Sequence, residues 1–270
     1  MSIDDWILVA TRELSLADIQ SSRLDAELIL AHTLRQPRTY LHAHGDDDLS
    51  ERHQEIASAR LQMRIERTPI AYIIGHKDFY GYPFKTTPAA LIPRPESEVF
   101  IKILTEILPK DYKKMTLVDV GTGTGCIGVT AKLQWPKLDA TLTDISTHAL
   151  NLARENAEDL KADVHFINDN LLDGVSKNPD IIVSNLPYIN RGWEVSPETS
   201  TEPEMALFAD EGGLSLIYKL IDQAETLQKS GAHLLLESDI RQHKEVVAYA
   251  KEHSYYHKKS IGLITYFVHE

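Results

Sequence analysis

The stretch from Thr116 to Gly128, TLVDVGTGTGCIG, constrains the fold more than any other part of the chain. Its first residues, TLVD, are typical of a short strand buried in a parallel sheet, and the apolar run that begins at Cys126 is typical of a helix. Between them, Gly121, Gly123 and Gly125 allow a tight turn. This order can bring backbone N–H groups close to a nucleotide-like ligand. Many α/β proteins share it without binding a ligand there, so the turn alone leaves function open.

Strands and helices alternate from Thr116 to the end of the chain. We expect strands near 116–120, 140–143, 163–167, 180–184 and 232–237, and helices near 125–134, 146–158, 213–229 and 241–252. This alternation predicts an α/β fold with a Rossmann-like, doubly wound and mostly parallel sheet. The apolar tail SIGLITYFVHE is expected to add an antiparallel strand at the edge of the sheet.

An acidic residue ends the second predicted strand. Asp144 lies 23 residues after Gly121. A carboxylate about 20 residues beyond such a turn can accept hydrogen bonds from ribose hydroxyls. The alternative interpretation is a helix N-cap, but Ser146 is better placed for that role. NAD and S-adenosylmethionine share this adenosine-side arrangement, so the choice between a dehydrogenase and a methyltransferase stays open here.

The region before this sheet is predicted to be a separate domain. Residues 1–70 contain amphipathic helical patterns over 4–14 and 22–34 and another that starts at Ser50. We interpret this part as a helical substrate-docking domain. The aromatic and glycine residues of 71–95 suggest a β-hairpin that links it to the Rossmann-like domain over 96–270.

Charge and composition narrow the classes of partner. The formal net charge of −12 argues against broad, sequence-independent binding to nucleic acid. No apolar run approaches the roughly 20 residues that span a bilayer, and the acidic N-terminus does not resemble a signal peptide. Cys126 is the only cysteine, which excludes an internal disulfide and makes a cytoplasmic location the default.

The segment SNLPYI after the fourth predicted strand carries the chemistry. Ligands of open parallel sheets bind beyond the carboxyl ends of the strands, which places Asn185 beside the glycine turn and Asp144. The Asn185 side-chain oxygen can accept one hydrogen of an –NH2 group, and a main-chain carbonyl in Leu186-Pro187 can accept the other. Tyr188 offers a flat face for stacking. This set suits methyl transfer to a planar amino or amide nitrogen, held so that its lone pair faces the methyl donor.

Motifs along nearly the whole chain sharpen this interpretation. They are RLDAELILAH, PIAYIIGHKDFYG, LIPRPESE, DVGTGTGCIG, SNLPYI, EPEMALFADEGGLS and LLLES. The set resembles the release-factor glutamine methyltransferase family, whose members are class I S-adenosylmethionine-dependent enzymes. They modify the glutamine of the Gly-Gly-Gln loop in class I peptide-chain release factors. The IPRPESE segment discriminates best, because nucleic-acid adenine methyltransferases generally lack it.

The resemblance implies roles for individual residues. S-adenosylmethionine would be bound, without a metal, by Gly121, Thr122, Gly123, Thr124, Gly125, Asp144, Asp169, Asn170 and Asn185. The glutamine amide would be held by Asn185, Leu186, Pro187 and Tyr188, with Asn185, Pro187 and Tyr188 as the catalytic set. Arg94, Glu96 and Glu98 would border the active site, and Glu202-Pro203 would be structural. The implied partners are class I release factors.

Two departures from the family pattern keep alternatives open. Leu186 stands where the family usually has proline, and Asn-Leu-Pro-Tyr also occurs in ribosomal-RNA adenine dimethyltransferases. Ser238-Asp239 stands where the family tends to have Ile-Gly. One alternative is therefore N6-adenine methylation of RNA or DNA. The other is a protein that binds the cofactor without catalysis, although the retained Asn185, Pro187 and Tyr188 argue against it.

Overall fold

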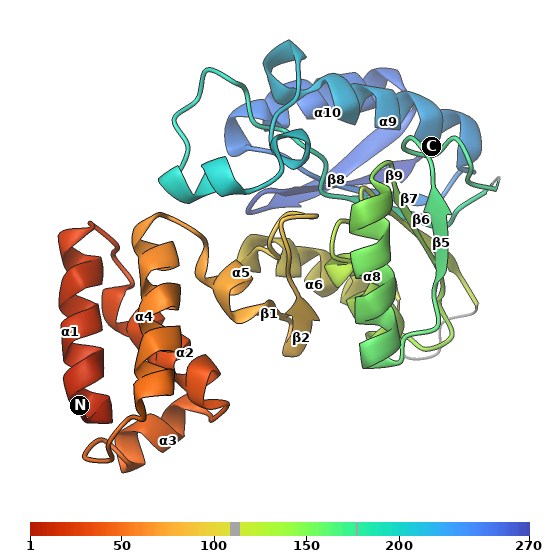
Figure 1. The fold of residues 1–270 in the computed structure, drawn as a ribbon. Coiled ribbons are helices and arrows are strands. Elements are labelled where there is room, and N and C mark those ends of the chain that lie inside the picture. The colour runs from red at the N-terminus through yellow and green to blue at the C-terminus, as the bar shows by residue number, and fades with distance from the viewer. Residues whose placement is uncertain (109–113, 177) are drawn as a thin grey trace. The chain divides into compact units, whose positions relative to one another are not determined.

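The computed structural model describes residues 1–108, 114–176 and 178–270, which form two compact units (Figure 1). The helical unit comprises Met1–His76 together with Ser196–Thr201, and the sheet unit comprises Lys77–Val195 and Glu202–Glu270. The division therefore falls after His76, and a short segment from within the second half of the sequence belongs to the first unit.

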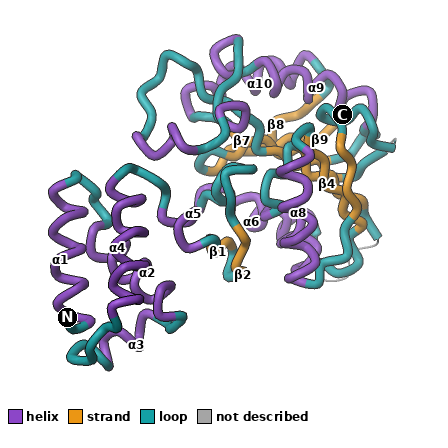
Figure 2. The backbone as a smooth tube through the Cα atoms, in the orientation of Figure 1, coloured by secondary structure: helices purple, strands orange, loops and turns teal. Residues whose placement is uncertain are grey.

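The helical unit contains five helices (Figure 2). They are α1 (Ile3–Leu16), α2 (Ser22–Leu34), α3 (Arg38–Ala43), α4 (Glu51–Ile65) and α5 (Ile70–Ile74). The three predicted helices are confirmed as α1, α2 and α4, and the Ser50 hydroxyl caps α4 by accepting from His53 N at 3.2 Å. Buried apolar side chains such as Trp6, Leu30 and Leu61 form the core of the unit.

The inserted segment Ser196–Thr201 is held to the helical unit by charge. Glu198 Oε1 lies 3.2 Å from Arg64 Nη1 and 3.4 Å from Arg67 Nη1. The buried Arg64 also contacts Asp25, with Nε 2.7 Å from Oδ2. Burial would raise the pKa of Glu198, but hydrogen bonds from Ser196 and backbone N–H and the charge of Arg64 lower it to about 2. Glu198 is therefore ionised at neutral pH.

The predicted hairpin is shorter than the sequence pattern indicated. Strands β1 (His76–Phe79) and β2 (Tyr82–Lys85) form it, whereas the apolar run Ile70–Ile74 is the helix α5. Pro69, at the N-cap of α5, is compatible with a helix start. Tyr80 and Gly81 both have positive φ, 50° and 81°, which is the geometry of a tight two-residue hairpin turn.

The sheet unit is built on seven strands in the order β5-β4-β3-β6-β7-β9-β8. They are β3 (Thr116–Val120), β4 (Asp139–Asp144), β5 (His165–Asn168), β6 (Ile181–Ser184), β7 (His233–Glu237), β8 (Tyr255–Ile261) and β9 (Ile264–His269). Strands β3 to β7 are parallel, which confirms the predicted doubly wound sheet. The tail forms an antiparallel strand, as predicted, but its predicted place at the edge was wrong: β9 lies between β7 and β8, and β8 occupies the edge.

Helices cover both faces of this sheet. Figure 1 shows α9 (Ser215–Leu227) and α10 (His243–Glu252) together on one side, and α6 (Glu98–Ile107) and α8 (Thr147–Leu160) on the other. The helix α7 (Cys126–Gln134) follows the glycine turn and packs on the same side as α6 and α8. Neighbouring residues of β3 alternate between the two cores, Leu117 in one and Val118 in the other.

The five parallel strands bring their carboxyl ends to one edge of the sheet. These ends are Val120 in β3, Asp144 in β4, Asn168 in β5, Ser184 in β6 and Glu237 in β7. Ligand sites of open α/β sheets form at this edge. No helix among the described residues has the length and apolar character needed to cross a membrane.

Candidate active site

Hydrogen bonds to the side chain of Asp119 hold the glycine turn that follows β3. The buried Asp119 carboxylate accepts from Thr122 Oγ1 at 2.6 Å and from Gly128 N at 2.9 Å. Burial outweighs these bonds and raises the pKa of Asp119 to about 6. Gly121 and Gly123 have φ of 68° and 57°, a conformation that costs L side chains energy. The turn is therefore specified both by its glycines and by the carboxylate beneath them.

Asp144 ties the end of β4 to this turn. Its carboxylate accepts from Gly123 N at 2.9 Å and from Ser146 N at 2.8 Å. Ser146 is the N-cap of α8, as predicted, because its hydroxyl accepts from Ala149 N at 3.2 Å. Burial raises the pKa of Asp144 although both N–H bonds oppose the shift. Asp144 is thus held as an acceptor at the wall of a cavity rather than used as a helix cap.

That cavity has a volume of about 400 Å³ and lies at the carboxyl ends of the strands. Of the residues predicted to bind a cofactor, Gly121, Gly123, Asp144, Asn170 and Asn185 line it. Its other walls are mostly apolar and include Ala90, Ile145, Leu171, Leu186, Phe208 and Leu216. A carboxylate and an amide set among apolar walls suit a ligand with a planar base and hydroxyl groups.

Four other predicted binding residues do not line this cavity. The Thr122 hydroxyl bonds Asp119, and the Thr124 carbonyl accepts from Asn156 Nδ2 at 2.9 Å. A Cβ on Gly125 would lie 3.2 to 3.4 Å from Ala153, Val129 and Leu142, so this glycine lets α7 pack closely. Asp169 bonds the N–H of its neighbour Asn170 at 2.8 Å. These residues shape the turn and the loop after β5.

A smaller cavity of about 80 Å³ adjoins the segment after β6. It is lined by Leu91, Arg94, Asn185, Leu186, Pro187, Tyr188, Ile189, Ala206, Leu207 and Glu237. Asn185, Leu186 and Pro187 line both cavities. The residues predicted to hold a planar amide therefore lie at the junction of a larger and a smaller cavity.

A chain of hydrogen bonds runs beneath this junction. Asn185 Nδ2 donates to Ser97 Oγ at 3.1 Å, and Ser97 Oγ donates to Glu237 Oε2 at 2.6 Å. The Tyr188 hydroxyl donates to the other Glu237 oxygen at 3.2 Å. Glu237 is 2% exposed, and burial raises its pKa to about 7 against the lowering effect of both hydroxyls. Burial and the charge of Glu237 also raise the pKa of Tyr188, which keeps its phenol protonated.

Glu237 was not predicted as a site residue. It ends the buried strand LLLE, just as Asp144 ends β4. A charged residue closing an apolar strand was the available signal, because an acidic side chain is rarely buried unless it is paired. Its partner Ser97 lies 140 residues earlier in the sequence, so the pairing itself could not be predicted from local pattern.

A second residue missed by the sequence analysis is Gln242, which holds the main chain at Tyr188. The buried Gln242 Nε2 donates to the carbonyls of Tyr188 and Gly212, at 2.8 Å each. Asp239 begins the short 3₁₀ helix Ile240–Gln242: its carboxylate accepts from Arg241 N at 2.9 Å, and its N–H donates to Gln242 Oε1 at 3.0 Å. The departure Ser238-Asp239 thus supplies a helix cap that orients Gln242.

Of the charged residues in the IPRPESE segment, Arg94 lines the smaller cavity, whereas Glu96 and Glu98 do not. Arg94 lines the smaller cavity and contacts the buried Glu202, with Nη2 2.5 Å from Oε1. Glu202 also accepts from Ile92 N at 3.3 Å, a structural contact of the kind expected for it. Glu96 is exposed and lines neither cavity. Glu98 accepts from Tyr80 N at 2.9 Å and so faces the hairpin.

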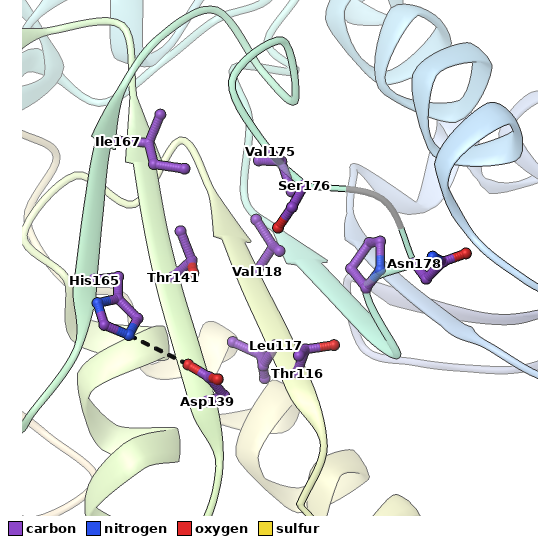
Figure 3. A pocket seen from close by; sticks show the side chains of 11 residues that line it. Thr116, Leu117, Val118, Asp139, Thr141, His165, Ile167, Val175, Ser176 and Asn178 are labelled. Carbon is purple, nitrogen blue, oxygen red and sulfur yellow. Dashed lines mark ion pairs between the residues drawn. The ribbon is translucent and has the colours of Figure 1, made fainter.

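Another hollow lies at the opposite ends of the strands (Figure 3). Its volume is about 210 Å³, and it is lined by the first residues of three strands, Thr116, Asp139 and His165. His165 Nε2 lies 3.4 Å from Asp139 Oδ1 there. None of the predicted site residues lines this hollow, which separates it from the candidate active site. Within 1–108, 114–176 and 178–270, no group of three or more His, Cys, Asp or Glu could hold a metal ion.

Comparison with known proteins finds two family models that match parts of this chain. Residues 5–75 match the family model of the PrmC N-terminal domain, and residues 97–205 match that of the Methyltransferase small domain. A release factor glutamine methyltransferase of Koribacter versatilis is 36% identical, covering 84% of this chain and 83% of the relative. One from Deinococcus radiodurans is 35% identical, covering 89% and 87%.

A solved structure has the same fold. The 16S rRNA N2 G1207 methyltransferase of T. thermophilus, solved with AdoMet and guanosine, matches with a TM-score of 0.53. The match covers 72% of this chain and 49% of that one, at 16% sequence identity. At this identity the likeness concerns the Rossmann-like methyltransferase architecture.

Proposed function

This chain belongs to the release factor glutamine methyltransferase family, and we propose that it methylates the side-chain nitrogen N5 of a protein glutamine. The substrate we propose is the glutamine of the Gly-Gly-Gln loop of class I peptide-chain release factors, and the methyl donor is S-adenosylmethionine. One observation carries the proposal: Asn185 lines both the 400 Å³ cavity with the glycine turn and the 80 Å³ cavity with Tyr188 and Arg94.

The polar and apolar residues that line the larger cavity suit S-adenosylmethionine as a ligand. Asp144, held by two backbone N–H groups, has lone pairs left for ribose hydroxyls, and Asn170 lines the same cavity. Ile145 and Leu171 supply apolar surface for an adenine ring. When bound, S-adenosylmethionine supplies a methyl group made electrophilic by its sulfonium.

The residues of the smaller cavity position the amide. Asn185 Oδ1 accepts one amide hydrogen and the Leu186 carbonyl the other, while the Tyr188 ring lies along the amide plane. Two acceptors in these directions disfavour delocalisation of the nitrogen lone pair and aim it at the methyl group. After the nitrogen has gained its methyl group it loses a proton to solvent, so a strong general base is not required. Leucine at 186 keeps the carbonyl that this mechanism needs.

The comparisons favour this function over adenine methylation, because relatives that match most of this chain are named release factor glutamine methyltransferases. The two departures that motivated the hypothesis of lost catalysis also have structural explanations. Leu186 packs in the core beside Gly121, and Asp239 caps the turn that holds Gln242. Both departures therefore have structural roles that leave Asn185, Pro187 and Tyr188 in place.

We further propose that the helical unit binds the release factor outside its Gly-Gly-Gln loop. A groove of about 660 Å³ in this unit is lined by the cations Arg35, Arg38 and Arg60, by His32 and His76, and by apolar residues such as Leu28 and Ile56. No Asp or Glu lines it among the described residues. Arg38 is paired with the nearby Glu27, as is Arg23, so Arg35 and Arg60 are the groove arginines without an ion pair among the described residues. A cationic groove on a chain of net charge −12 suits an acidic protein segment. A cytoplasmic location follows from this partner.

Methyl transfer from labelled S-adenosylmethionine tests the proposed function. Purified release factor, the same factor with its Gly-Gly-Gln glutamine replaced, and ribosomal RNA are offered separately. We expect label on the first substrate alone, and none with the Asn185→Ala enzyme although it still binds the cofactor. Label on RNA instead of the release factor would overturn the proposal and support adenine methylation. Cofactor binding without transfer by the parent enzyme would support lost catalysis.

A further inference from the structure

The side-chain amide of Asn185 has two possible orientations that differ in chemistry. With Oδ1 toward the cavities it accepts hydrogen bonds from a substrate –NH2 group, and with Nδ2 toward them it repels that group. In the structure Nδ2 is turned to Ser97 Oγ. Asn185 Oδ1 has no partner among the described residues and is not one of the buried unpaired atoms, so it is open to the cavities that Asn185 lines.

The direction of the Ser97 hydroxyl decides which orientation is stable. An ionised carboxylate only accepts hydrogen bonds, so Ser97 must donate its single hydrogen to Glu237. Its remaining lone pairs then face Asn185, which can satisfy them only with Nδ2. A neutral amide in place of Glu237 could donate to Ser97 instead, and Ser97 would then be free to donate to Asn185 Oδ1. The ionised Glu237 therefore sets the donor and acceptor directions of the hydrogen bonds from Ser97 to Asn185.

We propose that Glu237 is a positioning residue, which acts through Ser97 to hold Asn185 Oδ1 toward the substrate and through the hydroxyl of Tyr188 to hold that ring. Tyr188 donates to the Glu237 oxygen that Ser97 does not use. The Glu237 carboxylate thus orients both the acceptor Asn185 Oδ1 and the ring of Tyr188 at the amide site. This role rests on the proposed methyl transfer to an amide.

The position of Glu237 in the fold supports this role. It ends the interior strand β7 and pairs with Ile264 of β9, so its main chain is held by the sheet. Ser97, 1% exposed, lies immediately before α6, and the segment after β6 carries Asn185 and Tyr188. Three separate chain segments are therefore joined through one carboxylate, in contact with the smaller cavity.

Charged and titratable neighbours on each side determine when Glu237 is ionised. Arg94 lowers its pKa and Glu96 raises it, both from the segment before α6. Tyr188 stays protonated, and burial raises the pKa of Cys126 to about 12, so the thiol is neutral. On the 3₁₀ turn that follows β7, Asp239 is charged and paired with Arg241, whereas Gln242 has no charge. The orientation of Asn185 should then follow the protonation of Glu237 as the pH is changed through neutrality.

The first test uses the free enzyme and does not depend on methyl transfer. The side-chain amide resonances of Asn185 are identified in nitrogen-15 spectra by their loss in Asn185→Ala. We expect these resonances to shift between pH 6 and pH 8, near the pKa of about 7 for Glu237, and to lose that shift in Glu237→Gln. An unchanged pH response in Glu237→Gln would overturn the proposal.

The second test measures turnover with release factor and with cofactor at saturation. Glu237→Gln and Ser97→Ala are expected to lower kcat on the order of 10- to 100-fold, with cofactor affinity retained. Ser97→Thr keeps the hydroxyl and should restore most of kcat. The double variant Glu237→Gln/Ser97→Ala should be no slower than the worse single variant, because both act on one chain of bonds.

Glu225→Gln is the matched control, since Glu225 also accepts from a serine hydroxyl, that of Ser254 at 3.0 Å, but lines neither cavity. It should leave kcat unchanged. Full kcat in Glu237→Gln would overturn the positioning role. Absence of transfer by the parent enzyme, with the expected pH response of Asn185 intact, would overturn the proposed function and leave the orientation by Glu237 standing.

Discussion

The side chain of Leu186 lies directly over Gly121, so that its Cδ2 is 2.8 Å from the point where a Cβ on Gly121 would be. The two residues close the junction between the glycine turn and the catalytic segment. Leu186 is buried, and it lines both cavities. The leucine that departs from the family pattern is thus accommodated because the turn opposite it has no side chain.

Gly121→Ala is expected to weaken cofactor binding as well as folding. The residue has φ of 68°, where an alanine costs roughly 1–2 kcal/mol, and the new methyl group would push Leu186 into the cavities. We expect the dissociation constant of S-adenosylmethionine, measured by calorimetry, to rise at least about tenfold, which corresponds to about 1.4 kcal/mol.

Gly262→Ala is the control for backbone strain. Its φ is 57° and nothing lies within 4 Å of the position that the new methyl group would take, so it should lose similar stability and keep its cofactor affinity. Equal losses of affinity in both variants would show that strain, not the contact with Leu186, explains the effect at Gly121.

The main chain at Tyr188 gives the next prediction. Gln242→Glu would replace the N–H donor shared by the Tyr188 and Gly212 carbonyls with a carboxylate oxygen that repels both. We expect the free energy of unfolding to fall by about 1–3 kcal/mol and kcat to fall while the KM for cofactor stays close to that of the parent. Denaturant unfolding and steady-state kinetics check this. A loss of stability without any change in kcat would contradict a role of Gln242 in holding the catalytic segment.

Much of this architecture was predictable because its signals are local. The strand at 116–120 is buried along most of its length, and a run of apolar residues beside a glycine turn suffices to identify it. The position of Asn185 beside the cavity could be predicted because it directly follows the buried strand β6. The tail was placed wrongly at the sheet edge because the sequence shows that a segment is a strand but not which strand it joins. The Arg64–Glu198 contact spans 134 residues and has no local signal.

The same reasoning explains which site residues were missed. Ser97 and Glu237 are joined across 140 residues, and Gln242 meets the Tyr188 carbonyl across 54. Their roles arise from the order of strands in the sheet, which brings the ends of β6 and β7 together. The family resemblance implies cofactor contacts for Thr122 and Thr124, and these stay predictions. In the structure the Thr122 hydroxyl bonds Asp119, the Thr124 carbonyl bonds Asn156, and neither residue lines the larger cavity.

Stability and activity should respond to pH in opposite directions through Glu237. Its pKa is about 7 in the folded protein against an ordinary 4.5, so the folded state holds its proton more tightly than the unfolded state. The stabilising contribution is therefore full below about pH 4.5 and is lost as the pH rises to about 7, by up to roughly 3 kcal/mol. Over the upper part of this range kcat should rise, because the ionised form orients Asn185.

The difference between the parent and Glu237→Gln isolates this effect. Asp119, with a pKa of about 6, also contributes to the pH dependence of the parent, but it contributes equally to the variant. Unfolding free energies at pH 5, 6 and 7.5 should fall more steeply in the parent than in the variant. Parallel curves would mean that Glu237 titrates at its ordinary pKa in the folded state.

The groove in the helical unit gives a prediction about substrate choice. Burial lowers the pKa of His32, and the neighbouring charge of Arg60 adds to this effect. Arg60 Nη1 donates to Thr33 Oγ1 at 2.9 Å, and Arg35 lies exposed at the end of α2. Arg35→Glu/Arg60→Glu should raise the KM for intact release factor on the order of tenfold and weaken its dependence on salt, because an acidic segment loses its partners.

A short peptide that carries only the Gly-Gly-Gln loop separates docking from catalysis. Its kcat/KM should be the same in the parent and in the double variant, since the peptide has no segment to place in the groove. Arg12→Glu tests a single charge reversal outside the groove and is compared with Arg35→Glu alone as well as with the double variant, because Arg12 is exposed on α1. If Arg12→Glu raised the KM for release factor as much as the double variant, net charge and not the groove would govern binding. If the peptide reaction fell with the protein reaction, the substitutions would have damaged the active site, and the docking role would be wrong.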